Sequence, residues 1–157
     1  MTPAVNAAKK ARIAYTLHAY THDPAAPSYG TEASEKLGID AARVFKTLVA
    51  QIDTHRFAVA VIPVCSMLSL KRLAAAANAK KARMADGPDV ERISGYVLGG
   101  VSPLGQKKRL DTFIDAGARE FPTIFVSAGR RGLELELSPD DLQTLSSAVF
   151  APLTQTQ

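Results

Sequence analysis

A lysine inside an apolar run is the first feature of this sequence whose chemistry needs an explanation. Lys46 lies in the run Val-Phe-Lys-Thr-Leu-Val at residues 44–49, which is typical of a β-strand. Burying an ammonium group without a partner is costly. The lysine therefore fits either the wet face of an edge strand or a cleft in which it holds a phosphate or carboxylate. Strand alternation would place Lys46 and Leu48 on one face, and Phe45, Thr47 and Val49 on the other.

A glycine-rich loop is the second such feature. Residues 99–108 read Gly-Gly-Val-Ser-Pro-Leu-Gly-Gln-Lys-Lys and follow the apolar run 96–98, which we expect to be a short strand. Adjacent glycines permit positive φ and a close approach by another molecule. Bare N–H groups would suit the carbonyl or phosphate oxygens of a ligand. The local pattern alone also fits a tight turn between two strands.

Other chemistries find little support. His18 and His22 lie across an expected strand-to-loop boundary, where a spacing of four does not share a face, and His55 stands alone in a turn. Cys65 fits a small buried hydrophobe or, without any recognisable catalytic signature around it, a nucleophile. Neither a Gly-x-Ser-x-Gly elbow nor a phosphate-binding glycine motif is present. We therefore expect neither a metal nor a cofactor.

Composition favours one globular domain over residues 1–157, large enough to bury a core. No apolar run approaches the roughly 20 residues of a membrane span. A single cysteine rules out a disulfide framework within the chain, and residues 1–6 lack the pattern of a secretory signal, so we expect a cytoplasmic protein. The net charge of +4 permits a polyanionic partner such as nucleic acid. The basic residues cluster at Lys71, Arg72, Lys80, Lys81 and Arg83, at Lys107, Lys108 and Arg109, and at Arg130 and Arg131.

The periodicity predicts an α+β protein with a mixed, curved sheet, because helices and strands do not alternate regularly. We expect helices at 3–12, 31–37, 70–77 and 138–149, with a turn or short helix at 88–93. Strands are expected at 13–20, 44–50, 56–63, 82–84, 110–115, 123–127 and 133–137, the second and third forming a hairpin. Residues 21–30 read as a long loop, and residues 154–157 as a frayed tail.

Three segments together resemble the YbaK/EbsC family, free-standing relatives of the editing domain inserted in bacterial prolyl-tRNA synthetase. They are Phe-Lys-Thr-Leu at 45–48, the loop at 99–108, and Val-Ser-Ala-Gly at 126–129 followed by Arg-Gly-Leu-Glu at 131–134. The resemblance runs essentially end to end. It implies a single α+β domain with a curved, mixed, barrel-like sheet flanked by helices. It also implies editing of mischarged tRNA.

The resemblance further implies a mechanism without a protein nucleophile. In deacylation of Cys-tRNA(Pro), the thiol of the misattached cysteine attacks its own ester carbonyl and releases a thiolactone. Editing is needed because a synthetase pocket extracts only about 1–3 kcal/mol from a small difference in side-chain size. As a hypothesis, Lys46 anchors the 3′-terminal nucleotide, while N–H groups of Gly100 and Val101 hold the developing oxyanion.

The remaining candidates would shape the substrate pocket. The resemblance places Tyr20, Tyr29 and Gly30 at its wall. A family aspartate appears here as Glu134, with Glu136 two residues on, and the sequence leaves open which of the two faces the pocket. Polar or loop candidates beside them are Thr47, Gly99, Ser102 and Ser127.

Two alternatives stay open. The chain could be a water-using deacylase for another mischarged aminoacyl-tRNA, or a non-catalytic module that binds tRNA or a synthetase. In the leading interpretation the partners are the acceptor end of a mischarged tRNA and prolyl-tRNA synthetase, and the protein acts as a monomer.

Overall fold

A computed structural model of the chain describes residues 1–26 and 29–155, without the side chains of residues 29 and 30. The helices are α1 (Pro3–Ala11), α2 (Tyr29–Leu37), α3 (Leu70–Ala76), α4 (Gly87–Ser94) and α5 (Pro139–Ser146), with short 3-10 helices η1 (Ala41–Arg43) and η2 (Ala116–Glu120). The strands are β1 (Thr16–Ala19), β2 (Phe45–Ile52), β3 (Arg56–Pro63), β4 (Ala82–Met84), β5 (Asp111–Asp115), β6 (Ile124–Arg130), β7 (Leu133–Leu137) and β8 (Val149–Ala151).

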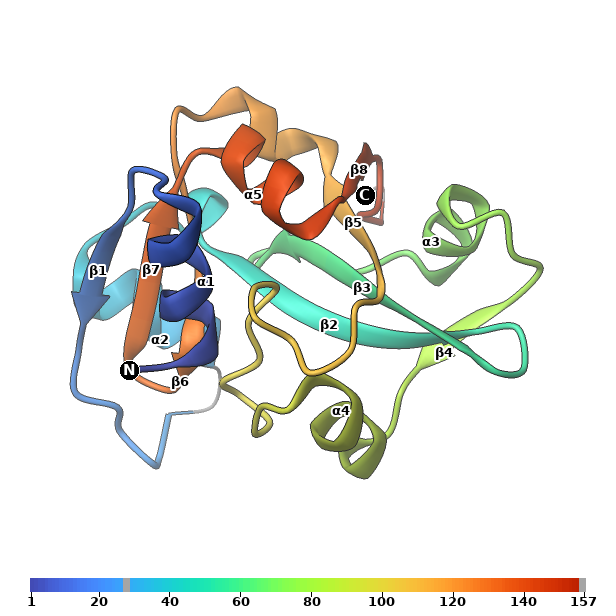
Figure 1. Cartoon of the computed structure of the whole chain (residues 1–157), viewed down its shortest axis with the longest axis horizontal. Coiled ribbons are helices and arrows are strands. Elements are labelled where there is room, and N and C mark those ends of the chain that lie inside the picture. Colours follow the sequence, from blue (N-terminus) through green and yellow to red (C-terminus); the bar gives the residue numbers. More distant parts are fainter. Residues whose placement is uncertain (27–28, 156–157) are drawn as a thin grey trace.

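The strands form two sheets (Figure 1). One sheet has the order β1-β7-β6 and is antiparallel, whereas the other has the order β4-β2-β3-β5-β8 and mixes antiparallel with parallel pairs. Val44, just before β2, makes a parallel bridge to Phe125 in β6, so the start of β2 joins the two sheets. The α+β class is confirmed. The expected barrel-like sheet is not, because neither sheet closes on itself within the described residues.

Helix caps follow the sequence signals closely. The side chains of Thr2, Ser69 and Ser138 accept hydrogen bonds from the first turns of α1, α3 and α5, as Ser/Thr N-caps do. The expected hairpin is formed by β2 and β3, paired over their full lengths. Helix α2 begins at Tyr29, two residues before the expected cap at Thr31.

Three expectations near the ends of elements are wrong. Residues 96–98 form a turn rather than a strand, because Tyr96 is turned inward and its hydroxyl donates to the Leu104 carbonyl at 2.5 Å. The last helix ends at Ser146, since Ser147 takes a left-handed conformation (φ 55°), and β8 follows it beside β5. Thr154 is not frayed but bridges Leu68, while residues 156–157 lie outside the described part.

The hydrophobic core lies on both faces of β2. Phe45 and Val49 belong to the core that the two sheets and α1 enclose, and Leu48 packs into the core under α3. The predicted alternation of β2 is therefore confirmed. Helix α2 contributes Ala33 to a third cluster with Phe125 of β6, which covers the other face of the small sheet. Among the described residues, no helix has the length and apolar character needed to cross a membrane.

Candidate active site

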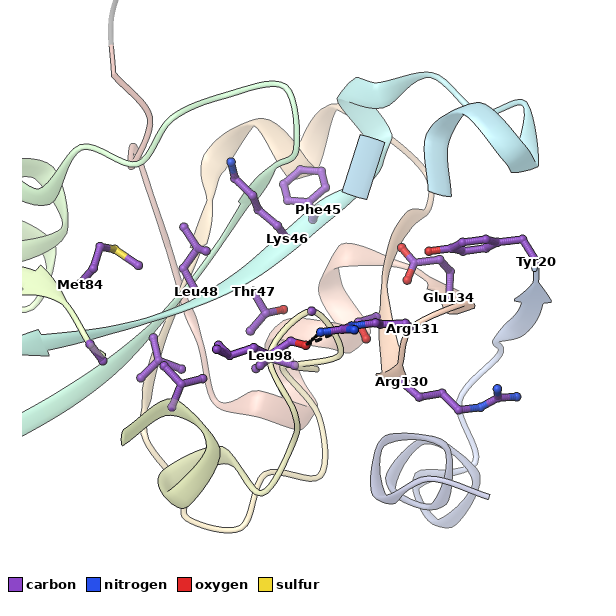
Figure 2. A pocket seen from close by; sticks show the side chains of 16 residues that line it. Tyr20, Phe45, Lys46, Thr47, Leu48, Met84, Leu98, Arg130, Arg131 and Glu134 are labelled. Carbon is purple, nitrogen blue, oxygen red and sulfur yellow. Dashed lines mark hydrogen bonds between the residues drawn. The ribbon is translucent and has the colours of Figure 1, made fainter. Parts of the chain in front are cut away.

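A cavity of about 410 Å³ opens between the two sheets (Figure 2). Its walls come from the end of β1, from β2, from the end of β4 with α4, from the glycine loop, and from the β6–β7 hairpin. The lining residues are Tyr20, Phe45, Lys46, Thr47, Leu48, Val49, Met84, Ala85, Val90, Leu98, Gly99, Val101, Ser127, Arg130, Arg131 and Glu134.

The cavity runs along one edge of β2. Five consecutive residues, 45–49, line it although their side chains alternate between opposite faces, which is possible only for a site at the strand's edge. The other edge of β2 is paired with β3 throughout. On the cavity side, the Val44–Phe125 bridge closes the start of the strand, and Ala85 N–H donates to the Val49 carbonyl at 3.1 Å. The edge is therefore open at Thr47.

Thr47 presents three hydrogen-bonding groups there. Val64 N–H donates to the Val44 carbonyl, so the even-numbered residues of β2 direct their main-chain groups toward β3, and Thr47 directs its N–H and C=O to the open edge. Its Oγ1 is buried and has no hydrogen-bond partner among the described residues. A buried, unpaired hydroxyl beside an open strand edge suits a polar ligand.

The Lys46 side chain projects from the face of β2 opposite to that of the Thr47 side chain (Figure 2). Figure 2 shows its Nζ pointing away from the Thr47 hydroxyl, as the strand alternation requires. Partial burial lowers the pKa of the Lys46 ammonium, and the nearby Cys65 offsets this in part. Cys65 itself is exposed and does not line the cavity, so the structure gives no support to a nucleophilic role for it.

Glu134 is the carboxylate that faces the cavity. The residue is 7% exposed, and burial raises the pKa of its carboxyl group to about 8. The Tyr20 hydroxyl points toward it in Figure 2; burial first, and then the charge of Glu134, raise the pKa of Tyr20 to about 12. Ser127, opposite Glu134 in the β6–β7 register, lines the same wall.

Glu136 shares a strand face with Glu134 but lies outside the cavity. It pairs with His18 (Nε2–Oε1 2.9 Å) and Arg43 (Nη2–Oε2 3.6 Å) and accepts a hydrogen bond from Thr123 (2.5 Å). Burial alone would raise its pKa, but these hydrogen bonds and the Arg43 charge together lower it. Of the two carboxylates that the sequence left open, Glu134 therefore lines the cavity, whereas Glu136 lies outside it in a cluster with His18, Arg43 and Thr123.

The glycine loop reaches the cavity through Gly99 and Val101. Gly99 has φ 84°, and the Val101 N–H has no acceptor among the described residues. The Gly100 N–H instead donates to the Val97 carbonyl at 3.0 Å, so the structure does not direct it into the cavity. Ser102 is fully buried outside the cavity, where its hydroxyl accepts from Leu104 N–H.

Sequence reasoning missed two arginines in the cavity wall. The sequence assigns Arg130 only to a basic cluster, and Arg131 to that cluster and to the motif at 131–134, but neither to the pocket. Arg131 Nε and Nη2 both donate to the Leu98 carbonyl (3.2 and 2.7 Å), which ties the β6–β7 turn to the start of the glycine loop (Figure 2). A signal was present, since Arg131 opens the motif at 131–134 and Arg130 lies between it and the motif at 126–129. Tyr29 and Gly30 begin α2, but their surroundings lie outside the described part.

The described residues include no group of three His, Cys, Asp or Glu side chains that could hold a metal ion. The cavity instead combines main-chain groups, hydroxyls, cations and one buried carboxyl group. It is of the size and character of a small-molecule site. Chemically, it can hold an ester or phosphate and orient it.

Comparisons with known proteins point to one family. The model of the aminoacyl-tRNA editing domain matches residues 23–145. A protein of Enterococcus faecalis named "Putative Cys-tRNA(Pro)/Cys-tRNA(Cys) deacylase EbsC" is 42% identical over 121 residues, which is 77% of this chain and 74% of that protein. The uncharacterized protein YwhH of Bacillus subtilis is 26% identical over 115 residues, 73% of each chain.

Solved structures share the fold. The crystal structure of "a putative trans-editing enzyme for prolyl tRNA synthetase" superposes with a TM-score of 0.80 at 19% identity and covers 99% of both chains. That of the hypothetical protein APE2540 gives 0.86 at 23% identity, covering 98% of this chain and all of the other. The family model spans most of the chain, and the fold agrees with that of a solved structure described as a trans-editing enzyme. The chain therefore belongs to the aminoacyl-tRNA editing domain family, whose free-standing YbaK/EbsC members its motifs resemble.

Proposed function

We propose that the protein deacylates mischarged Cys-tRNA(Pro), with the thiol of the attached cysteine as the nucleophile. The observation that carries this proposal is the composition of the cavity wall, which offers main-chain groups, hydroxyls, cations and one buried carboxyl group, and neither His nor Cys among its described residues. Such a wall can position an ester and the thiol that the substrate itself brings. The relationship to a protein named as a Cys-tRNA deacylase supports the same substrate.

The chemistry is an intramolecular acyl transfer. The cysteine sulfur forms a bond to its own carbonyl carbon, the ester C–O bond breaks, and the ribose oxygen leaves with a proton that the thiol has given up. A thiol of pKa about 8.5 is a few per cent thiolate near neutrality and is already a good nucleophile. Orienting it can contribute on the order of 7–11 kcal/mol to lowering the barrier.

The protein's part is to hold the ester and stabilise the oxyanion. The Val101 N–H, which has no other acceptor among the described residues, is the main-chain donor of the glycine loop that we assign to the carbonyl oxygen. Lys46 anchors the phosphate of the 3′-terminal nucleotide at the rim, and Thr47 and Ser127 contact the aminoacyl group. Tyr20, with Tyr29 and Gly30 as the family resemblance implies, shapes the wall around it.

One observation favours a second candidate function. Glu134 is a buried carboxyl group in the cavity wall, and burial raises its pKa to about 8, so its ionised form is a stronger base than an ordinary carboxylate. A water-using deacylase for another mischarged amino acid would employ Glu134 to activate the water. In that case the substrate would need no thiol.

We also propose that residues 1–157 act as one domain, as a cytoplasmic monomer that works with prolyl-tRNA synthetase. The structural relative described as a trans-editing enzyme for that synthetase supports the partner. The basic clusters suit the acceptor end of tRNA, and a domain of this size would take its tRNA specificity in part from the synthetase.

A single-turnover deacylation assay over a panel of aminoacyl-tRNAs tests the proposal. Cys-tRNA(Pro) should lose its amino acid rapidly, whereas Ala-tRNA(Pro) and Pro-tRNA(Pro) should be largely spared. Preferential deacylation of Ala-tRNA(Pro) would favour the water-using candidate. Salt-dependent tRNA binding without deacylation of any member would show a binding module instead.

A further inference from the structure

Glu134 differs from the other buried glutamate of this fold in having no cation beside it. Glu32 pairs with His22 (2.7 Å) and Lys36 (3.0 Å), whereas no Lys, Arg or His side chain of the described residues lies within ion-pair distance of Glu134. Glu134 is nevertheless only 7% exposed and lines the cavity. Tyr20, whose hydroxyl points toward it, is neutral.

An unpaired buried carboxylate is costly because the interior replaces little of its lost hydration. The cost is offset when a ligand brings a positive charge to the same place. The cavity is open to such a ligand, so Glu134 marks the position at which a cationic group fits. The lining cations, Lys46, Arg130 and Arg131, instead suit an anionic part of the same ligand.

An aminoacyl ester at the end of a tRNA carries both kinds of charge. Its phosphates are anionic, and its α-amino group is its cationic group. We propose that Glu134 binds the free α-ammonium group of the aminoacyl ester, so that the protein accepts aminoacyl-tRNA and rejects esters whose α-nitrogen is acylated, such as peptidyl-tRNA. The inference rests on the proposed function, because only then is the ligand an aminoacyl ester.

Proton balance is consistent with this pairing. An α-amino group has a pKa of about 7.7–8.0, close to that of Glu134. At pH 7 both free groups are therefore mostly protonated, so forming the ion pair releases close to one proton. Near pH 8 the two groups together hold about one proton, and the pair forms with little net uptake or release of protons.

The test is calorimetric binding of two stable amide analogues of the aminoacyl terminus, 3′-cysteinylamino-3′-deoxyadenosine and its N-acetyl derivative. Wild-type protein should bind the free amine about 10- to 100-fold more tightly, the range expected for a hydrogen bond to a charged group. The near-isosteric Glu134→Gln should lose most of this preference by weakening only the free-amine analogue. Glu136→Gln, on the same strand but outside the cavity, should keep it.

Equal binding of the two analogues by wild type, or no binding of the free amine, would overturn the inference. A preference that survives in Glu134→Gln would also overturn it, since the N-acetyl group would then be excluded by its size. Deacylation of Cys-tRNA(Pro) and N-acetyl-Cys-tRNA(Pro) separates this inference from the proposed function. Equal rates refute α-amine recognition alone, whereas amine-selective binding without deacylation refutes the function alone.

Discussion

Replacing Glu134 by glutamine should change how stability depends on pH, independently of any substrate. The folded-state pKa of Glu134 is about 8, against 4.5 for an unperturbed glutamate. Between these values the folded protein binds more protons than the unfolded chain, so stability falls as pH rises. The full difference is on the order of 5 kcal/mol at about 1.4 kcal/mol per pH unit. About 4 kcal/mol of it lies between pH 5 and pH 9.

Urea unfolding of wild type and Glu134→Gln from pH 5 to pH 9 measures this difference. Glutamine does not titrate, so the stability of the variant relative to wild type should rise by about 4 kcal/mol across that range. Any pH-independent cost of burying the amide cancels in the comparison. Glu136→Gln is the matched control; because the pKa of Glu136 is lowered, its variant should be less stable than wild type at neutral pH. Parallel pH profiles for wild type and Glu134→Gln would refute the reasoning.

The other expectations concern the rim, the loop and α2. Lys46→Ala should reduce the rate of deacylation about 10- to 100-fold, because the ammonium group is proposed to bind a phosphate of the substrate. The free energy of unfolding in urea should change little. Unchanged single-turnover rates would exclude that role. Gly100→Ala should lower the free energy of unfolding in urea by about 1–3 kcal/mol and slow deacylation. The reason is that a Cβ at this position would lie 3.0 Å from the main chain at Arg130. Wild-type stability and activity would show that the loop can move aside. The hydrogen bond from His22, with further contacts, lowers the pKa of Glu32 to about 2. Glu32→Gln should therefore be less stable than wild type at pH 7, and its stability should approach that of wild type as the pH falls toward 2. Thermal melts measure this, and a difference in melting temperature that does not change with pH would contradict it.

Local patterns predicted most of the elements because their causes are local. The apolar run of β3, the alternation of β2 and the caps at Thr2 and Ser138 each depend on a few neighbouring residues. Strand β8 was missed because it is three residues long and is defined by pairing with β5, far away in the sequence. The turn at 96–98 was mistaken for a strand because Tyr96 is buried with its hydroxyl on the Leu104 carbonyl, while the apolar Val97 and Leu98 are exposed and do not pair with a strand.

The candidate site divides in the same way. The Lys-Thr pair at 46–47 and the glycine loop were visible as motifs, but the open edge at Thr47 depends on where β4 ends and on the Val44–Phe125 bridge. Glu134 and Glu136 could not be ranked by alternation, since both lie on one face of β7. Tertiary contacts separate them, because His18, Arg43 and Thr123 hold Glu136 while Glu134 lines the cavity.

The central claim is that the substrate supplies its own nucleophile. Single-turnover deacylation of cysteinyl-tRNA(Pro) and S-methylcysteinyl-tRNA(Pro) tests it directly, because methylation removes the thiol and leaves the ester and the α-amino group in place. The account predicts rapid release of tRNA and a thiolactone from the first substrate, and a rate at least about 100-fold lower for the second. Similar rates for the two esters, with free amino acid as the product, would contradict it and assign the reaction to water.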